Sequence, residues 1–238
     1  MIEIFYKTIP FFALIGLGYS AAITRFFSAE ATAYLTKFVF YFALSAMLFR
    51  FSSDLSLSEL YDPEFIYAYL SASLIIYFLA TAIAIFRKKA PSEAAVEAQC
   101  SVIGNVGFLG IPMLAILMGP KSVGFIMIIL AIDLIVFGSL IVLIIVASKD
   151  KKLDIFLFYR VLLGLMKNPM IVSIICGLLW SASGWSIPGP VNDFVIMLGS
   201  AATPGALFAI GASLAQKSTE RFEVAAWLSF CKLVLHPV

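Results

Sequence analysis

The stretch Gln99-Cys-Ser-Val-Ile-Gly-Asn-Val-Gly-Phe-Leu-Gly-Ile-Pro-Met113 decides how this chain of 238 residues folds. It lies in an apolar run over residues 93–118, which is long enough to cross a bilayer as a helix. The run nevertheless contains three glycines, an asparagine and a proline. Proline donates no backbone hydrogen bond and clashes with the carbonyl four residues earlier, while glycine adds backbone freedom. The stretch therefore predicts a membrane helix that is broken near the bilayer midplane.

A broken helix leaves backbone amides and carbonyls that lipid cannot satisfy, but that water or a polar ligand can. We expect the second half-helix to begin near Pro112, because proline is favoured in a first turn. The positive end of its dipole would face the midplane and favour an anion. The Asn105 amide adds a donor and an acceptor beside the break, and Ser101 lies one turn earlier on the same helix face. The predicted anion site in this span consists of Ser101, Gly104, Asn105, Gly107 and Pro112.

The alternative is a proline kink whose asparagine merely joins two helices. In that case the same residues would pack the protein and bind nothing. The three glycines beside the proline favour the ligand site over this alternative.

The composition of the chain indicates a membrane protein. Hydrophobic residues make up 62% of the chain and charged residues only 13%, and the mean hydropathy is +1.05. A soluble protein of this size cannot hide so much apolar surface, so a soluble enzyme, a nucleic-acid binder and a disordered chain are excluded. One histidine and three dispersed cysteines make neither a metal site nor a disulfide framework. We expect no cofactor and no enzymatic activity, because the sequence has no ATPase or membrane hydrolase motif.

Seven apolar runs are long enough to be membrane helices, and an eighth begins near Phe222 and runs to Val238. We also expect an amphipathic interfacial helix at Ile155–Met166, and an interfacial Trp185 in the turn after the sixth run. The predicted fold is an all-α polytopic membrane protein with about seven and a half spans. The seven runs cover residues 4–24, 31–51, 64–86, 93–118, 122–147, 168–183 and 191–215.

Lysine and arginine predict the orientation of the chain, because cytoplasmic loops carry an excess of both. With the N-terminus outside, the inner loops hold eleven of these residues and the outer loops three. The acidic loop at 54–64 then also lies outside. We therefore predict a multi-pass protein of a prokaryotic cytoplasmic membrane with its N-terminus outside.

An internal repeat relates the two parts of the chain. Equivalent residues lie 159 positions apart, and five spans separate the start of one unit from the start of the next, so the second unit is inverted in the membrane. We place the first five-helix repeat at 1–151 and the start of the second at 152–238. The second unit would extend beyond Val238, so we expect the ninth and tenth spans to be missing. The equivalent pairs are Pro10 and Pro169, Gly18 and Gly177, Ala43 and Ala202, Leu48 and Leu207, and Phe49 and Phe208.

Other polar residues within the spans are further candidates. Asp133 lies midway along the fifth run, where an acid is costly; it is either a coupling site or a structural partner of another polar group. Lys232 and His236, one turn apart, form a relay for anions or protons or are simply paired and packed. Ser45 and Pro204 lie at matching places in the second and seventh runs, where a kink packed by small residues is the alternative to ligand contact.

The motif Gly-Asn-Val-Gly-Phe-Leu-Gly-Ile-Pro at 104–112 resembles the Asn-x-Gly-Phe-Leu-Gly-x-Pro segment of the auxin efflux carrier family. This family includes the plant PIN-formed carriers and the prokaryotic malonate-type permeases. Residues 12–19, Lys-Asn-Pro at 167–169 and Thr-Pro-Gly-Ala-Leu-Phe-Ala-Ile-Gly-Ala-Ser-Leu-Ala at 203–215 are similar as well. The resemblance therefore covers essentially the whole chain.

The resemblance implies ten spans in two inverted five-helix repeats and an elevator-like carrier of organic anions. Spans 1, 2, 6 and 7 would form a scaffold, and spans 3–5 and 8–10 a transport part whose broken helices 4 and 9 cross at the substrate. Asn105 and Pro112 match the crossover residues of the family. Ser45 departs from the family pattern, because many relatives have a proline there.

Three functions remain open. The first is a secondary transporter of small organic anions that lies in the lipid bilayer, with a homodimer as one of the oligomeric states left open. The second is a sodium- or proton-coupled transporter of another substrate on the same fold. The third is a membrane sensor or assembly subunit that does not transport.

Overall fold

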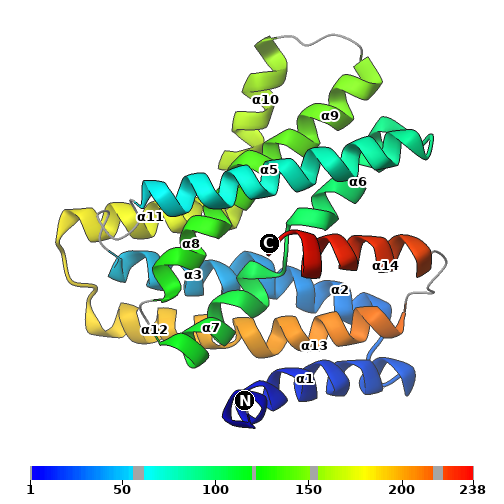
Figure 1. Cartoon of the computed structure of the whole chain (residues 1–238). Coiled ribbons are helices and arrows are strands. Elements are labelled where there is room, and N and C mark those ends of the chain that lie inside the picture. Colours follow the sequence, from blue (N-terminus) through cyan, green and yellow to red (C-terminus); the bar gives the residue numbers. More distant parts are fainter. Residues whose placement is uncertain (1, 56–61, 120–121, 151–154, 217–221, 238) are drawn as a thin grey trace. The chain divides into compact units, whose positions relative to one another are not determined.

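A computed structural model describes residues 2–55, 62–119, 122–150, 155–216 and 222–237, and within these ranges the chain is helical and has no strand (Figure 1). Six segments are long and apolar enough to cross a membrane, and Pro169–Ser183 is a shorter apolar helix. These seven segments match the seven predicted runs and confirm an all-α, multi-pass membrane protein. The six are Ile2–Ile23, Ala29–Asp54, Pro63–Phe86, Pro91–Met118, Ser122–Ser148 and Gly189–Ala215.

Thirteen labelled α-helices make up most of the described chain. The predicted helix at Ile155–Met166 is confirmed with these bounds as α10. The others are α1 (Ile2–Ile23), α2 (Ala29–Phe38), α3 (Leu44–Asp54), α5 (Pro63–Phe86), α6 (Pro91–Val102), α7 (Ile111–Met118), α8 (Ser122–Ile132), α9 (Gly138–Asp150), α11 (Pro169–Ser183), α12 (Gly189–Ser200), α13 (Ala202–Ala215) and α14 (Phe222–Phe230).

The described residues include four π-helical turns, each with a backbone hydrogen bond that spans five residues. One example is the bond from the Gly110 amide to the Asn105 carbonyl, at 2.9 Å. Such turns are rare in proteins, and many of those that occur lie at functional sites. The four are η1 (Val39–Ala43), η2 (Val106–Gly110), η3 (Asp133–Phe137) and η4 (Cys231–Leu235).

The chain divides into two compact units, which we describe separately. Unit 1 comprises Met1–Tyr61, Asn105–Met127 and Pro169–Ser218; within it α1 packs along α13, and α3 packs against α11 and α12 (Figure 1). Unit 2 comprises Asp62–Gly104, Ile128–Asn168 and Thr219–Val238; within it α6 packs against α5 and α9, and η4 contacts both α5 and α6. The predicted division into repeats at residue 151 concerns internal symmetry, and it stays a prediction.

Two glycines hold the helix pairs of unit 1 at very short distances. A Cβ added at Gly18 of α1 would lie 2.0 Å from the Phe208 carbonyl oxygen of α13. A Cβ added at Gly177 of α11 would lie 2.6 Å from the Phe49 carbonyl oxygen of α3. Only glycine leaves room for backbones this close, and small residues at membrane helix contacts allow such packing.

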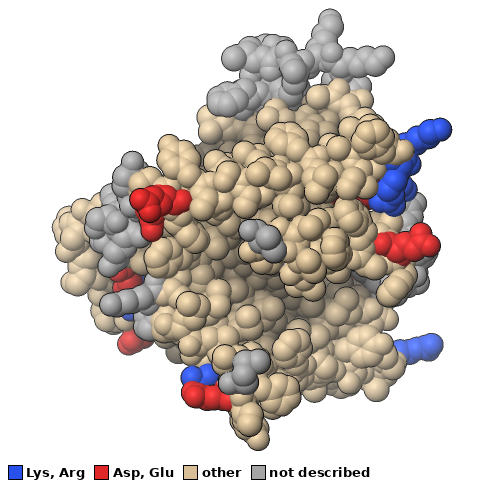
Figure 2. All heavy atoms as spheres, viewed as in Figure 1, with Lys and Arg blue, Asp and Glu red and all other residues tan. Residues whose placement is uncertain are grey.

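Charged side chains are sparse on the face that Figure 2 draws, where uncharged residues dominate. Large apolar side chains such as Phe12, Phe78 and Phe194 are 60–67% exposed, as expected for residues that face lipid. Parts of the predicted acidic loop at 54–64 and of the polar stretch Ser-Lys-Asp-Lys-Lys at 148–152 lie outside the described residues.

The N-terminus of α5 offers a test of local helix stability. The Asp62 carboxylate accepts a hydrogen bond from the Phe65 amide at 3.0 Å, and Pro63 occupies the first turn. We expect Asp62→Ala to lower the free energy of unfolding by about 1 kcal/mol, because it removes this N-cap. Asp62→Asn should be nearly neutral, since asparagine caps equally well. Thermal unfolding of the purified protein in detergent measures both; equal losses would contradict the capping role.

Candidate functional site

The fourth span contains a short non-helical stretch. Helix α6 ends at Val102, Ile103–Asn105 are not helical, and helical structure resumes with η2 at Val106. The amide of Ile103 still donates to the Gln99 carbonyl at 2.9 Å and thereby ends α6. The interruption also separates the two units, because Gly104 belongs to unit 2 and Asn105 to unit 1.

Asn105 is the N-cap of the second helical segment. Its Oδ1 accepts a hydrogen bond from the Phe108 amide at 3.2 Å, and its carbonyl accepts from the amides of Leu109 and Gly110. The residue is exposed, and within the described chain its side-chain Nδ2 donates to no partner. The amides of Val106 and Gly107 have no acceptor inside a helix that starts here. Gly107 is buried, so the exposed Nδ2 and the Val106 amide are the donors available to a ligand.

The predicted start of the second half-helix near Pro112 needs a correction. Pro112 does lie in the first turn of α7, but the π-turn η2 runs directly into α7, since Gly110 is already helical with φ −60° and ψ −56°. The helical N-terminus therefore lies at Asn105–Gly107, and not at Pro112. The physical reason is the Asn105 cap, which satisfies the Phe108 amide and allows helical structure to begin before the proline.

The other predicted residues of this span have separate surroundings. Ser101 is fully buried in unit 2, and its hydroxyl donates to the Glu97 carbonyl at 2.9 Å. The prediction that Ser101 shares a helix face with Asn105 is wrong, because α6 ends between the two residues. In unit 2, a Cβ at Gly104 would lie 3.3 Å from Lys232 Cε. In unit 1, Gly107 is buried, and a Cβ there would lie 3.3 Å from Met170 Cε.

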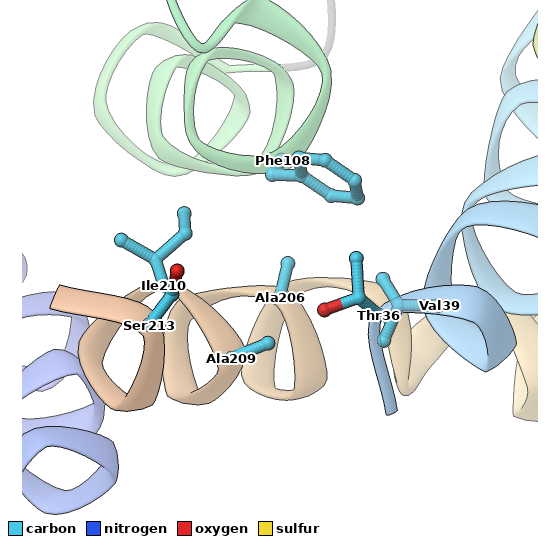
Figure 3. A pocket seen from close by; sticks show the side chains of 7 residues that line it. All are labelled: Thr36, Val39, Phe108, Ala206, Ala209, Ile210 and Ser213. Atoms are coloured by element: carbon cyan, nitrogen blue, oxygen red, sulfur yellow. The ribbon is translucent and has the colours of Figure 1, made fainter. Parts of the chain in front are cut away.

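A cavity of about 160 Å³ lies beside Phe108 within unit 1 (Figure 3). We call it the Phe108 cavity. In Figure 3 the Phe108 ring faces α13 from the opposite side of the cavity. The lining is mostly apolar, with hydroxyl groups from two residues. The lining residues are Thr36, Val39, Phe108, Ala206, Ala209, Ile210 and Ser213.

Ser45 and Pro204 also belong to unit 1, but they do not line the Phe108 cavity. The Ser45 hydroxyl donates to the Phe40 carbonyl at 3.4 Å, next to the π-turn η1. Pro204 lies in the first turn of α13, just after Ala201 interrupts the seventh span. Both residues accompany local irregularities of their helices, and their contact with a ligand stays a prediction.

Unit 2 contains a cluster of polar residues around Asp133, the first residue of η3. Asp133 is 3% exposed, and its Oδ1 accepts a hydrogen bond from the Tyr69 hydroxyl at 2.8 Å. Its Oδ2 is buried and has no hydrogen-bond partner among the described residues. His236 Nε2 lies 3.0 Å from Ser73 Oγ, and its ring packs edge-on against Tyr69 at 5.8 Å. Lys232 interacts electrostatically with Asp133. We call these five residues the Asp133 cluster.

The sequence reasoning found three members of this cluster and missed Tyr69 and Ser73. Their spacing was the available signal, because Tyr69, Ser73 and Tyr77 are polar residues at every fourth position of an otherwise apolar span. Phe108 was also not selected, because its importance arises from contacts with α2 and α13 that are distant in sequence.

Two comparisons with known proteins indicate the family of the chain. The family described as "Membrane transport protein" matches residues 3–238. A protein of Rhizobium meliloti (strain 1021) with the name "Putative malonate transporter" is 28% identical over 241 residues. That alignment covers 100% of this chain and 75% of the relative.

Proposed function

The chain belongs to the membrane transport protein family, of the auxin efflux carrier type, and from this premise we propose that it carries small organic anions across the cytoplasmic membrane. Family membership indicates transport, and not enzymatic catalysis, as its role. The substrates that we propose are small carboxylates of the malonate type, in keeping with the name of the relative.

The observation that carries this proposal is the exposed helical N-terminus at Asn105. Free amides and the positive end of a helix dipole attract anions. Asn105 adds a side-chain donor at the same place. In a bilayer these groups need a polar partner, which an anion or water supplies.

The size of the Phe108 cavity supports the proposal that the substrate is small. Its volume of about 160 Å³ is well below the roughly 300–1,000 Å³ of pockets that hold drug-sized ligands. Asn105 Oδ1 accepts a hydrogen bond from the backbone amide of Phe108, which lines this cavity. We propose that the charged end of the substrate lies at Asn105 and its carbon chain beside Phe108.

We further propose an elevator-like mechanism in which the two units move relative to each other, with the broken fourth span as one of the chain segments that connect them. The proposal is supported by the division between Gly104 and Asn105, and by the presence of spans 1, 2, 6 and 7 in unit 1. Unit 1 also contains Asn105–Met127, which the family resemblance assigns to the transport part. An inverted repeat is supported by the two glycine contacts. Gly18 and Gly177 are equivalent in the repeat, as are their partners Phe208 and Phe49, so each contact joins one repeat to the other.

The Asp133 cluster favours coupling to a cation or a proton gradient. A buried carboxylate oxygen without a hydrogen-bond partner is costly unless a proton or cation completes its surroundings. We propose that Asp133 provides this coupling.

We also propose that the N-terminus lies outside, on the basis of the lysine and arginine bias.

The decisive test is Asn105→Asp, measured as uptake of radiolabelled malonate by proteoliposomes that contain the purified protein. Aspartate can still cap Phe108, because aspartate and asparagine are about equally good N-caps. It removes the amide donor, however, and places a negative charge against the anion. We expect uptake to fall by roughly 10- to 100-fold, the effect of losing a hydrogen bond to a charged group worth about 1.5–3 kcal/mol.

Asn105→Ser is the matched control, because serine caps the helix without adding charge, and it should retain more uptake than the aspartate variant. Uptake that is unchanged in Asn105→Asp would show that the anion binds elsewhere. Uptake of cations or neutral solutes by the wild-type protein, with none of carboxylates, would overturn the proposed substrate class.

A further inference from the structure

A second cavity in unit 1 contains none of the residues assigned to transport above. It has a volume of about 290 Å³, and its lining includes Arg50, Ser53, Asp54, Trp180, Trp185 and Asn192. We call it the Arg50 cavity. We infer that it is a binding site for a small carboxylate, held by the Arg50 guanidinium together with the Trp180 indole N–H and the Asn192 amide.

Two unpaired donors indicate an anionic ligand. Arg50 Nε and Trp180 Nε1 are both buried and have no hydrogen-bond partner among the described residues. Buried donors are nearly always bonded, so two such groups on residues that line one cavity call for an acceptor. The guanidinium fork matches the two oxygens of a carboxylate, and indole N–H groups can only donate.

Asp54 already neutralises part of the guanidinium. Its Oδ2 pairs with Arg50 Nη1, one turn apart on α3, and its side chain is 60% exposed against 29% for Arg50. An incoming carboxylate would therefore meet a like charge that competes for the same arginine. The ligand site and the ion pair are thus alternatives, which gives the two residues opposite expected effects on binding.

The site is held in place by close packing of α3 and α11. Gly177 lies against the Phe49 backbone three residues before Trp180, and the Trp180 ring packs edge-on against Phe49 and Trp185. The Ser181 hydroxyl adds a hydrogen bond to the Leu55 carbonyl at 2.5 Å. These contacts fix the indole beside the arginine before any ligand binds.

The size of the site suits a short carboxylate. Its volume lies just below the range of pockets for drug-sized ligands. A neighbouring cavity of about 330 Å³ is also lined by Arg50 and Asp54, and it extends to Ser200 and Thr203 at the interruption of the seventh span. A ligand at Arg50 would therefore have a mostly apolar cavity, with the hydroxyls of Ser200 and Thr203, on the other side of the ion pair.

Succinate is the probe for the test, titrated calorimetrically into the purified wild-type protein in detergent. We expect Arg50→Gln to weaken binding at least tenfold, because it removes the charge. Trp180→Phe should weaken binding severalfold, since it removes the indole donor and keeps an aromatic ring. Asp54→Asn should strengthen binding at least threefold, because it removes the competing carboxylate. Arg25→Gln, outside the cavity, is the control and should bind as the wild type does.

Tryptophan fluorescence locates the binding. In a Trp227→Phe background, Trp180 and Trp185 are the remaining tryptophans of the sequence, and succinate should change their emission. Asn105→Ala should preserve this change, so this inference and the proposed transport site can fail independently. Absence of succinate binding, weaker binding in Asp54→Asn, or a response only to vesicles with anionic phospholipid would each overturn the inference. Asp54→Asn and Trp180→Phe keep it testable if Arg50→Gln does not fold.

Discussion

Gly18→Ala is expected to destabilise the protein by about 3 kcal/mol or more. The added Cβ would lie 2.0 Å from the Phe208 carbonyl oxygen and 2.8 Å from its carbon, so the clash is with backbone and not with a side chain that could rotate away. Helices α1 and α13 would have to separate along their contact. Overpacking of a tight interior costs about 1–3 kcal/mol, and more where the neighbour cannot move. Thermal unfolding in detergent measures the loss.

Gly16→Ala is the matched control, because it lies on the same helix and a Cβ there meets nothing within 4 Å. Alanine favours helices over glycine by up to about 1 kcal/mol, so this variant should be neutral or more stable. Gly211→Ala, whose Cβ would lie 1.9 Å from the Ile15 carbonyl oxygen, should resemble Gly18→Ala. Equal melting temperatures for Gly16→Ala and Gly18→Ala would contradict the close packing of α1 and α13.

The same experiment tests the proposed repeat. Gly177→Ala would bring a Cβ to 2.6 Å from the Phe49 carbonyl oxygen, the equivalent contact in the other helix pair. If the two contacts are equivalent, Gly18→Ala and Gly177→Ala should both destabilise strongly. A large effect at one position with none at the other would argue against equivalent roles for the two glycines.

The sequence predicted the membrane spans well because their length and apolar composition are local properties. Helix α10 was predicted with its observed bounds, since its amphipathic pattern begins after a charged stretch and ends before a proline. The interruption at Ile103–Asn105 was expected from the glycines and the proline. Its position relative to Pro112 was not, because the side-chain cap of Asn105 and the π-turn η2 decide where the helix resumes.

Contacts between segments that are distant in the chain could not be predicted from the sequence. The pairing of Gly18 with Phe208 depends on which helices pack together, although both residues had been identified as members of the repeat. The bond between Tyr69 and Asp133 joins residues 64 positions apart. A single sequence shows that a buried acid needs a partner, and not which span supplies it.

Asp133→Asn is expected to abolish gradient-driven accumulation of the substrate while substrate exchange continues. Asparagine has nearly the same shape, and its carbonyl oxygen can still accept the Tyr69 hydroxyl bond. The charge is lost, however, and with it the ability of the buried, unpartnered Oδ2 to take up a proton or a cation. Proteoliposomes with an imposed proton or sodium gradient measure accumulation, and preloaded vesicles without a gradient measure exchange.

Tyr69→Phe separates coupling from structure, because it removes the hydroxyl and leaves the carboxylate in place. We expect it to lower the free energy of unfolding by roughly 1–3 kcal/mol, the cost of an unpaired buried acceptor, while accumulation persists.

Unchanged accumulation in Asp133→Asn would make Asp133 a structural partner of Tyr69. A double-mutant cycle with Lys232→Gln then measures the remaining interaction: if the two charges compensate each other, the double variant will be more stable than the two single losses predict.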